Sequence, residues 1–179
     1  KFFETSKYFQ LNKATYINLR WIAIIGQLLT VNLVAFFFKF EFNFIISNFI
    51  ILLGIFSNFY LIYFHKESYL TNKFCFFFNI DIFLLCFLIY LTGGITNPFI
   101  VFLIIPCIFS STNLDIKVNL FLVFITILLI TLLTFFHENL PRPISEHFHV
   151  SDYYYYSIPL ALSIALIFLN YFAMTFGSQ

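Results

Sequence analysis

The residues of this sequence best suited to hold a small molecule form a turn between two apolar segments. Residues 91–99 read Leu-Thr-Gly-Gly-Ile-Thr-Asn-Pro-Phe, which brings two glycines, an amide side chain and a proline close together. Glycine allows a ligand to approach the backbone, and the N–H groups at a helix N-terminus can donate to an electronegative atom. Phe99 and Phe102 can flank an aromatic ring. The turn therefore predicts a site for a ring compound that carries a carbonyl oxygen.

The same residues also fit an ordinary connection between two helices. Gly93 or Gly94 can end the first helix in the left-handed conformation. Asn97 suits the N-cap of the second helix, and Pro98 suits its first turn. The residues of the turn thus leave a structural and a binding role open.

The composition places this turn in a membrane. The chain of 179 residues is 61% hydrophobic and 9% charged, with a mean hydropathy of +0.95, whereas soluble domains carry about 25% charged residues. Its net charge of +1 argues against a nucleic-acid-binding surface. Irregular backbone survives in a bilayer only where protein covers it or a cavity adjoins it. A lipid-dissolved quinone, with its carbonyl oxygens, therefore fits the turn.

Six apolar segments predict an all-α membrane protein, a bundle of six transmembrane helices. A helix needs about 20 apolar residues to cross about 30 Å of hydrocarbon. The expected organisation is a cytoplasmic segment at 1–18, a transmembrane domain at 19–176 and the start of a cytoplasmic linker at 177–179. Because the chain opens without methionine and stops directly after an apolar segment, we expect it to be a fragment. The six segments are residues 19–38, 44–64, 74–92, 98–113, 116–136 and 156–176.

The basic residues predict the orientation of the bundle. With the N-terminus in the cytoplasm, seven of the nine basic residues lie inside, and Lys39 and Arg142 lie outside. This split favours N-in/C-in and puts the glycine turn on the outer side. Arg20 and Trp21 are then expected at the inner interface, with the Arg20 cation extended toward the headgroups.

The fourth segment, 98–113, is short for a membrane span. As an α-helix it covers about 24 Å, less than the hydrocarbon thickness, and Pro106 is expected to kink it. We therefore expect the glycine turn to lie below the outer membrane surface, within reach of a lipid-dissolved molecule.

Polar side chains inside the apolar segments are candidates for a layer through the bundle. Asp81 must face the bundle and be neutral or paired, because a charge at the bilayer centre is unfavourable by about 2.5–3.5 kcal/mol. Gln27, Asn58, Thr126 and Asn170 are expected at a similar depth and can bond between helices. Structural packing and a role in signal or proton relay both stay open for Asp81, Gln27 and Asn58.

The sequence predicts neither a catalytic residue nor a metal site. The three cysteines, Cys75, Cys86 and Cys107, lie singly in apolar segments, as small buried side chains do. The loop at 137–155 contains His137, His147 and His149 but no established ligand spacing.

The turn from Gly93 to Phe99 resembles the GGxxNPF heptapeptide of the RegB/PrrB-type redox-responsive sensor histidine kinases. Leu91-Thr92 before it and Pro106 with Ser110-Ser111 after it are similar to that family as well. So is the sequence Leu-Arg-Trp-Ile-Ala-Ile-Ile-Gly-Gln at 19–27. The resemblance covers essentially the whole chain, as the membrane sensor half of such a kinase.

This resemblance implies a function, a ligand and partners. Ubiquinone or a related quinone would be sensed at the heptapeptide, and oxidised quinone would lower kinase output. It also implies a multi-pass protein of the bacterial inner membrane, surrounded by lipid and acting as a homodimer, with a response regulator reached through the missing cytoplasmic half. The quinone-binding residues carried over from the motif are Gly93, Gly94, Asn97, Pro98 and Phe99, and Ile95 and Thr96 fall at its variable positions.

The family's catalytic parts have no counterpart in this sequence. ATP-binding glycine boxes and a phosphoacceptor helix are absent from it, and the sequence His-Glu-Asn-Leu-Pro at 137–141 falls in the expected outer loop. The fragment is therefore not expected to be an enzyme, whereas its full-length parent would bind ATP and phosphorylate a histidine. Two alternatives remain, an anchor subunit of a quinone-linked membrane enzyme and a small transporter with a broken helix.

Overall fold

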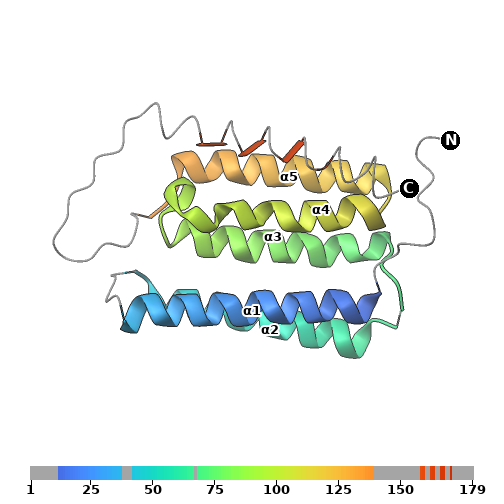
Figure 1. Ribbon diagram of the computed structural model, residues 1–179, viewed down its shortest axis with the longest axis horizontal. Helices are drawn as coiled ribbons and strands as arrows, with labels where there is room; N and C mark the ends of the chain where they lie inside the picture. The colour runs from blue at the N-terminus through green and yellow to red at the C-terminus, as the bar shows by residue number, and fades with distance from the viewer. Residues whose placement is uncertain are drawn as a thin grey trace.

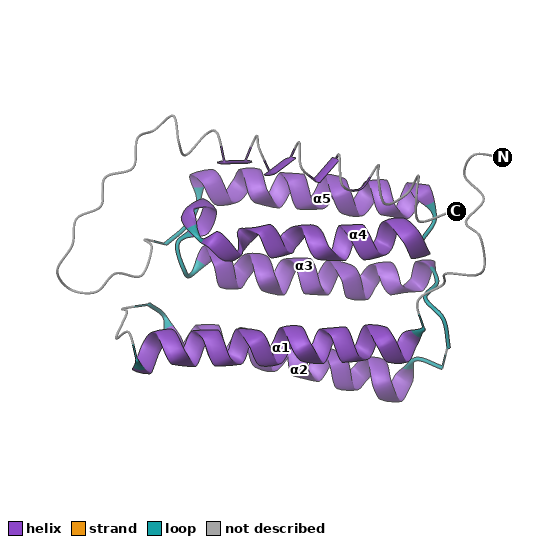
Figure 2. Cartoon of the chain, viewed as in Figure 1, coloured by secondary structure: helices purple, strands orange, loops and turns teal. Residues whose placement is uncertain are grey.

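Helices make up nearly all of the part of the chain that the structure describes. The computed structural model describes residues 12–37, 42–66 and 68–138, and seven positions of the sixth apolar segment, which are Ile158, Pro159, Leu162, Ser163, Leu166, Ile167 and Asn170. Over these residues the secondary structure is helical apart from short loops and one isolated bridge between Asn12 and Tyr69 (Figure 2). The described residues thus confirm the all-α class.

Five α-helices and three short 3₁₀-helices follow one another along the described chain. The α-helices are α1 (Lys13–Phe36), α2 (Phe44–Phe64), α3 (Cys75–Tyr90), α4 (Ile104–Asn113) and α5 (Ile116–Phe135). The 3₁₀-helices are η2 (Asn72–Phe74), η3 (Gly94–Thr96) and η4 (Pro98–Leu103).

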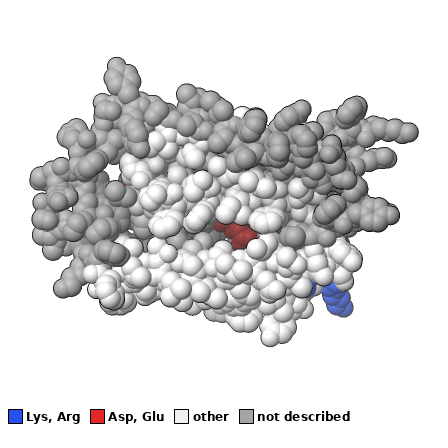
Figure 3. All heavy atoms as spheres, viewed as in Figure 1, with Lys and Arg blue, Asp and Glu red and all other residues white. Residues whose placement is uncertain are grey.

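Four of these helical units are long and apolar enough to cross a membrane: α1, α2, η2 with α3, and α5. The unit Pro98–Asn113 is shorter, as the sequence predicts. The side of the molecule shown in Figure 3 carries very few charged atoms on its described surface, as a surface in contact with lipid requires. The count of six spans and the N-in/C-in orientation stay predictions, and most of the sixth segment lies outside the described residues.

The helices form a pair and a three-helix group that pack side by side (Figure 1). Helix α1 packs against α2, and α3 packs against α2 as well as against α4 and α5. The main core fills the three-helix group, with Phe78, Ile82, Leu103 and Leu122 fully buried. Leu166 of the sixth segment is buried in the same core. A smaller cluster around Ile24, Val31, Ile51 and Leu88 joins the pair to α3.

Helix α1 begins earlier than its hydropathy predicts. Asn12 caps it, with its side chain accepting the backbone N–H of Ala14 at 3.1 Å, and the helix runs from Lys13 rather than from residue 19. The first turns are too polar to count as an apolar segment, but they continue the same helix. Arg20 therefore lies seven residues inside α1, about 10 Å from its start.

The fourth segment combines two kinds of helix. Its first six residues form η4 and its last ten form α4, which together span about 27 Å because a 3₁₀-helix rises about 2.0 Å per residue. The segment is thus about 3 Å longer than a continuous α-helix of the same residues. The change of geometry lies just before Pro106, which occupies the first turn of α4.

Candidate functional site

The glycine turn joins α3 to η4 through backbone that only glycine adopts readily. Gly93 has φ of 110° and Gly94 has φ of 54°, both in the left-handed region. Helix α3 ends at Tyr90, three residues before Gly93. The predicted left-handed conformation is confirmed for both glycines, whereas the helix itself ends earlier, with Leu91 as its right-handed C-cap.

The end of α5 packs directly against Gly94. A Cβ atom at Gly94 would collide with the side chain of His137 and would lie 2.9 Å from the carbonyl oxygen of Leu133. The backbone N–H of Glu138 donates to the carbonyl of Tyr90 at 2.9 Å. The close approach that Gly94 permits is thus made by the protein's own chain, and the turn is held from this side.

Asn97 organises the rest of the turn. Its Oδ1 accepts the backbone N–H of Phe99 at 2.9 Å, and its Nδ2 donates to Thr92 at both the carbonyl oxygen (3.0 Å) and Oγ1 (2.6 Å). Pro98 is the first residue of η4. The predicted N-cap at Asn97 and the predicted place of Pro98 are confirmed. A ligand that bonded to Asn97 would have to replace one of these internal bonds.

The part of the turn that faces outward is aromatic. Gly93, Gly94 and Asn97 are buried, whereas Pro98 is exposed and Phe99 is 42% exposed. The ring of Phe99 lies 5.8 Å from that of Phe102, which is 46% exposed, with the two rings tilted by 35°. The structure therefore brings the five predicted residues into one turn and offers an exposed pair of rings beside a buried polar frame.

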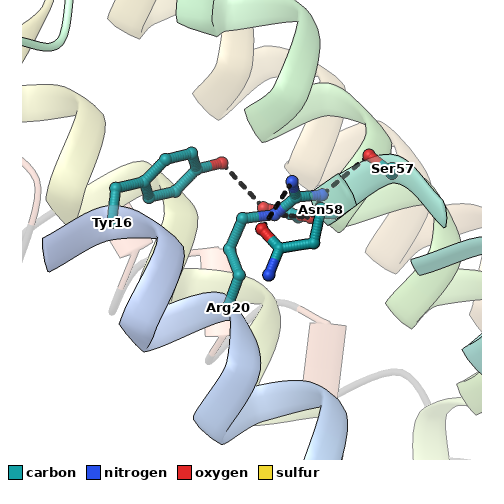
Figure 4. A network of polar contacts seen from close by, with 5 residues as sticks. Tyr16, Arg20, Ser57 and Asn58 are labelled. Carbon is teal, nitrogen blue, oxygen red and sulfur yellow. Dashed lines mark hydrogen bonds and ion pairs between the residues drawn. The ribbon is translucent and has the colours of Figure 1, made fainter. Parts of the chain in front are cut away.

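A second polar group lies between α1, α2 and α3, around the ion pair of Arg20 and Asp81 (Figure 4). Arg20 Nε and Nη2 donate to Oδ1 of Asp81 at 3.0 and 2.6 Å, and the hydroxyl of Tyr16 donates to Oδ2 at 2.8 Å. On the side of α2, Arg20 Nη2 donates to Ser57 Oγ at 2.9 Å and Nη1 donates to Asn58 Oδ1 at 3.4 Å. One guanidinium thus links three helices.

This geometry confirms one expectation about the polar residues and corrects another. Asp81 is paired, as a carboxylate inside an apolar helix must be. The expectation that Arg20 extends toward the headgroups is wrong, because its side chain is 4% exposed and turns toward Asp81. Trp21, the next residue, packs edge-on against Phe59 of α2, with ring centroids 5.5 Å apart.

The predicted polar layer is present in part. Asn58 joins Asp81 through Arg20, whereas Thr126 bonds to Cys107 Sγ at 3.1 Å and to the carbonyl of Leu122. Gln27 is half-buried, two turns beyond Arg20 along α1. The layer therefore has an ionic part between α1, α2 and α3 and a separate neutral part between α4 and α5.

Sequence reasoning missed Tyr16, Arg20 and Ser57 as members of the ionic group. The error follows from the start of α1, since a helix that began at residue 19 would leave Arg20 at its end. One feature of the sequence could have predicted the group: the apolar segments contain one arginine and one aspartate. Opposite charges inside a membrane are expected to form an ion pair.

Within residues 12–37, 42–66 and 68–138, no group of three or more His, Cys, Asp or Glu side chains could hold a metal ion. The three cysteines are free thiols, with Cys86 and Cys107 buried and Cys75 half-buried. His147 and His149 lie outside the described residues.

The comparisons with known proteins point to one kind of relative. No protein-family model matches the chain, and no solved structure matches it significantly. The sensor histidine kinase RegB of Cereibacter sphaeroides is 32% identical to it over 93 residues, which are 52% of this chain and 20% of that relative. The chain thus matches about a fifth of the length of the kinase. About half of this chain is thus similar in sequence to a sensor histidine kinase. The described part of the chain also contains four helices that are long and apolar enough to cross a membrane.

Proposed function

We propose that this chain is the membrane sensor domain of a two-component histidine kinase and responds to the redox state of the quinone pool. The observation that carries the proposal is the similarity to the sensor histidine kinase RegB, taken together with the form of the glycine turn. A buried frame around Asn97 holds the exposed rings of Phe99 and Phe102 at the start of a short membrane segment. A quinone ring dissolved in lipid can stack on these rings.

The proposed site consists of Gly93, Gly94, Asn97, Pro98 and Phe99. Because Asn97 bonds within the turn, a quinone carbonyl would take over one of its donors, most directly the Nδ2 group that now bonds to Thr92. Such an exchange would change the link between the end of α3 and the start of η4. Ligand binding would therefore act on how α3 and α4 pack.

Signalling requires that quinone bind two packings of the bundle with different affinity, since equal binding shifts no equilibrium. The sixth segment would carry the change to a cytoplasmic kinase, and two copies of the chain would act as a homodimer. Leu166 of this segment is buried in the core that α3 and α4 share, which supports a coupling between the turn and the segment that leads out of the membrane.

The histidine positions favour a sensor over an anchor subunit of a quinone-linked enzyme. A haem-binding anchor would place histidine ligands inside its spans. Among the described residues, His65 follows the last residue of α2 and His137 follows α5. Neither lies within a membrane-spanning helix.

Photo-crosslinking tests the proposal. A photoactivatable ubiquinone analogue is added to the purified chain in phosphatidylcholine nanodiscs, and labelled peptides are mapped by mass spectrometry. We expect the label on residues 93–102, with less labelling in Phe99→Ala. Phe124→Ala serves as the matched control, because Phe124 is an exposed ring on α5. Labelling spread over all exposed rings, and equal in both variants, would refute the assignment.

A further inference from the structure

The carboxylate of Asp81 reaches the apolar surface of the bundle. Its side chain is 25% exposed, whereas that of its partner Arg20 is 4% exposed. No other acidic residue that the structure describes lies within a helix of membrane-spanning length. Figure 3 shows acidic atoms at the surface, in the middle of a described face that carries few other charged atoms. A lipid-dissolved molecule can therefore reach this carboxylate from the side of the bundle.

The carboxylate still has capacity to accept a hydrogen bond. Oδ1 accepts two bonds from Arg20, and Oδ2 accepts one from the hydroxyl of Tyr16. Two carboxylate oxygens offer about four acceptor positions, so one position remains on Oδ2. An ionised carboxylate accepts and does not donate. The matching group on a ligand is therefore a hydrogen-bond donor such as a hydroxyl, and not a carbonyl or ether oxygen.

The other end of the same network is also incomplete. Asn58 is fully buried, and its Oδ1 faces the guanidinium of Arg20 while its Nδ2 has no hydrogen-bond partner. A buried donor left unpaired is unfavourable. The protein's own side chains therefore leave this network unsaturated at both ends, and the end at Asp81 is the one open to the surface.

Aromatic rings enclose the ion pair. The guanidinium of Arg20 lies 5.7 Å from the ring centroids of both Tyr16 and Phe77. Tyr16 in turn packs against Phe74 and Phe78, with centroids 5.9 and 4.9 Å away. These four rings are buried, so they keep the ion pair in apolar surroundings, where a hydrogen bond from a phenolic hydroxyl to the carboxylate is stronger than in water.

We propose that the exposed edge of Asp81 binds a lipid-soluble phenol or hydroquinone, whose ring hydroxyl donates a hydrogen bond to Oδ2. The site is distinct from the glycine turn, because α3 continues for nine residues from Asp81 to Tyr90, about 14 Å along the helix. A reduced quinone carries ring hydroxyls and an oxidised one does not. If the proposed quinone sensing holds, on which this last step rests, the site retains the reduced form.

Quenching of Trp21 fluorescence tests the site. Trp21 is the single tryptophan of the sequence and follows Arg20 directly. The purified chain in phosphatidylcholine nanodiscs is titrated with a bromine-substituted alkylphenol and with its methyl ether, which lacks the donor. We expect saturable quenching by the phenol and only weak, linear quenching by the ether from partition into lipid. Equal quenching by both compounds would overturn the proposal.

Variants assign the binding to the carboxylate. Asp81→Asn should weaken phenol binding about tenfold or more, because hydrogen bonds to a charged acceptor are about twice as strong as neutral ones. If that variant does not fold, the double variant Arg20→Leu/Asp81→Leu removes both charges and should abolish saturable binding. Phe83→Leu, an exposed position on the same helix, is the control and should bind normally. Unchanged phenol binding in the folded Asp81 variant would refute the site.

The two proposals can fail separately. The same preparations are labelled with the photoactivatable ubiquinone analogue in its oxidised form, which lacks the hydroxyl. Phenol binding without labelling of the turn would refute quinone binding at residues 93–99 and leave the Asp81 site standing. Labelling of the turn without phenol binding would refute the Asp81 site and leave quinone binding at residues 93–99 standing.

Discussion

Replacing Gly94 with alanine tests the contact between the turn and the end of α5. The new Cβ would collide with His137 and approach the Leu133 carbonyl oxygen to 2.9 Å, at a residue with φ of 54°. A left-handed conformation is unfavourable by about 1–2 kcal/mol for a residue other than glycine. Excess atoms in a packed site add about 1–3 kcal/mol. We therefore expect Gly94→Ala to lower the free energy of unfolding by about 2–5 kcal/mol.

The matched control is Gly54→Ala in α2. A Cβ at Gly54 meets its nearest atoms, on Ile24 and Leu84, at 3.7 to 3.9 Å, which is ordinary van der Waals contact. Its backbone is helical, where alanine is preferred over glycine by up to about 1 kcal/mol. This variant should be as stable as the parent or more stable. The free energy of unfolding is measured in mixed micelles by titration with dodecyl sulfate, followed by circular dichroism.

A second substitution separates the two causes. In the Gly94→Ala background, His137→Gly removes the side-chain atoms that the new Cβ would meet, so part of the lost stability should return. The part due to backbone conformation should remain. If Gly94→Ala and Gly54→Ala were equally stable, the packing of α5 against the turn described above would be incorrect.

Two further predictions concern the polar groups. Asp81→Asn leaves the buried Arg20 guanidinium without its counter-charge and should cost about 3 kcal/mol in the same unfolding assay, whereas Arg20→Leu/Asp81→Leu should recover most of this loss. A double variant no more stable than Asp81→Asn would show that the unpaired guanidinium is not the cause of the loss. Asn97→Ala removes the N-cap and the bonds to Thr92 and should cost about 2 kcal/mol, while Asn97→Asp keeps the cap acceptor and should cost less. Equal losses at Asn97 would mean that the cap contributes little.

Local signals in the sequence were sufficient to predict the turn. Left-handed glycine, asparagine at an N-cap and proline in a first turn each act over a few residues, and the structure confirms these three features, although α3 ends before the glycines, at Tyr90. The contact of Gly94 with His137 could not be predicted in this way, because the two residues are far apart in the sequence and meet only when α5 packs beside α3.

The ionic group shows how an error at a helix end spreads to the chemistry. Hydropathy alone marks where a chain becomes apolar, whereas α1 begins at its cap, Asn12, in a more polar stretch. Arg20 therefore looked like an interface residue, although it lies inside the bundle and pairs with Asp81. The 3₁₀ geometry of η4 was likewise missed, since a run of apolar residues does not distinguish it from an α-helix.

The binding of quinone at the turn is tested most directly by its affinity for single-ring variants. Decylubiquinone, in its oxidised form, is titrated into the chain in phosphatidylcholine nanodiscs, and the dissociation constant is compared between Phe99→Ala and Phe124→Ala. A stacked ring contributes about 0.5–1.5 kcal/mol, so Phe99→Ala should weaken binding about two- to twelvefold, and Phe124→Ala should leave it unchanged. Equal affinity in the parent and in folded Phe99→Ala would contradict a quinone site at this turn.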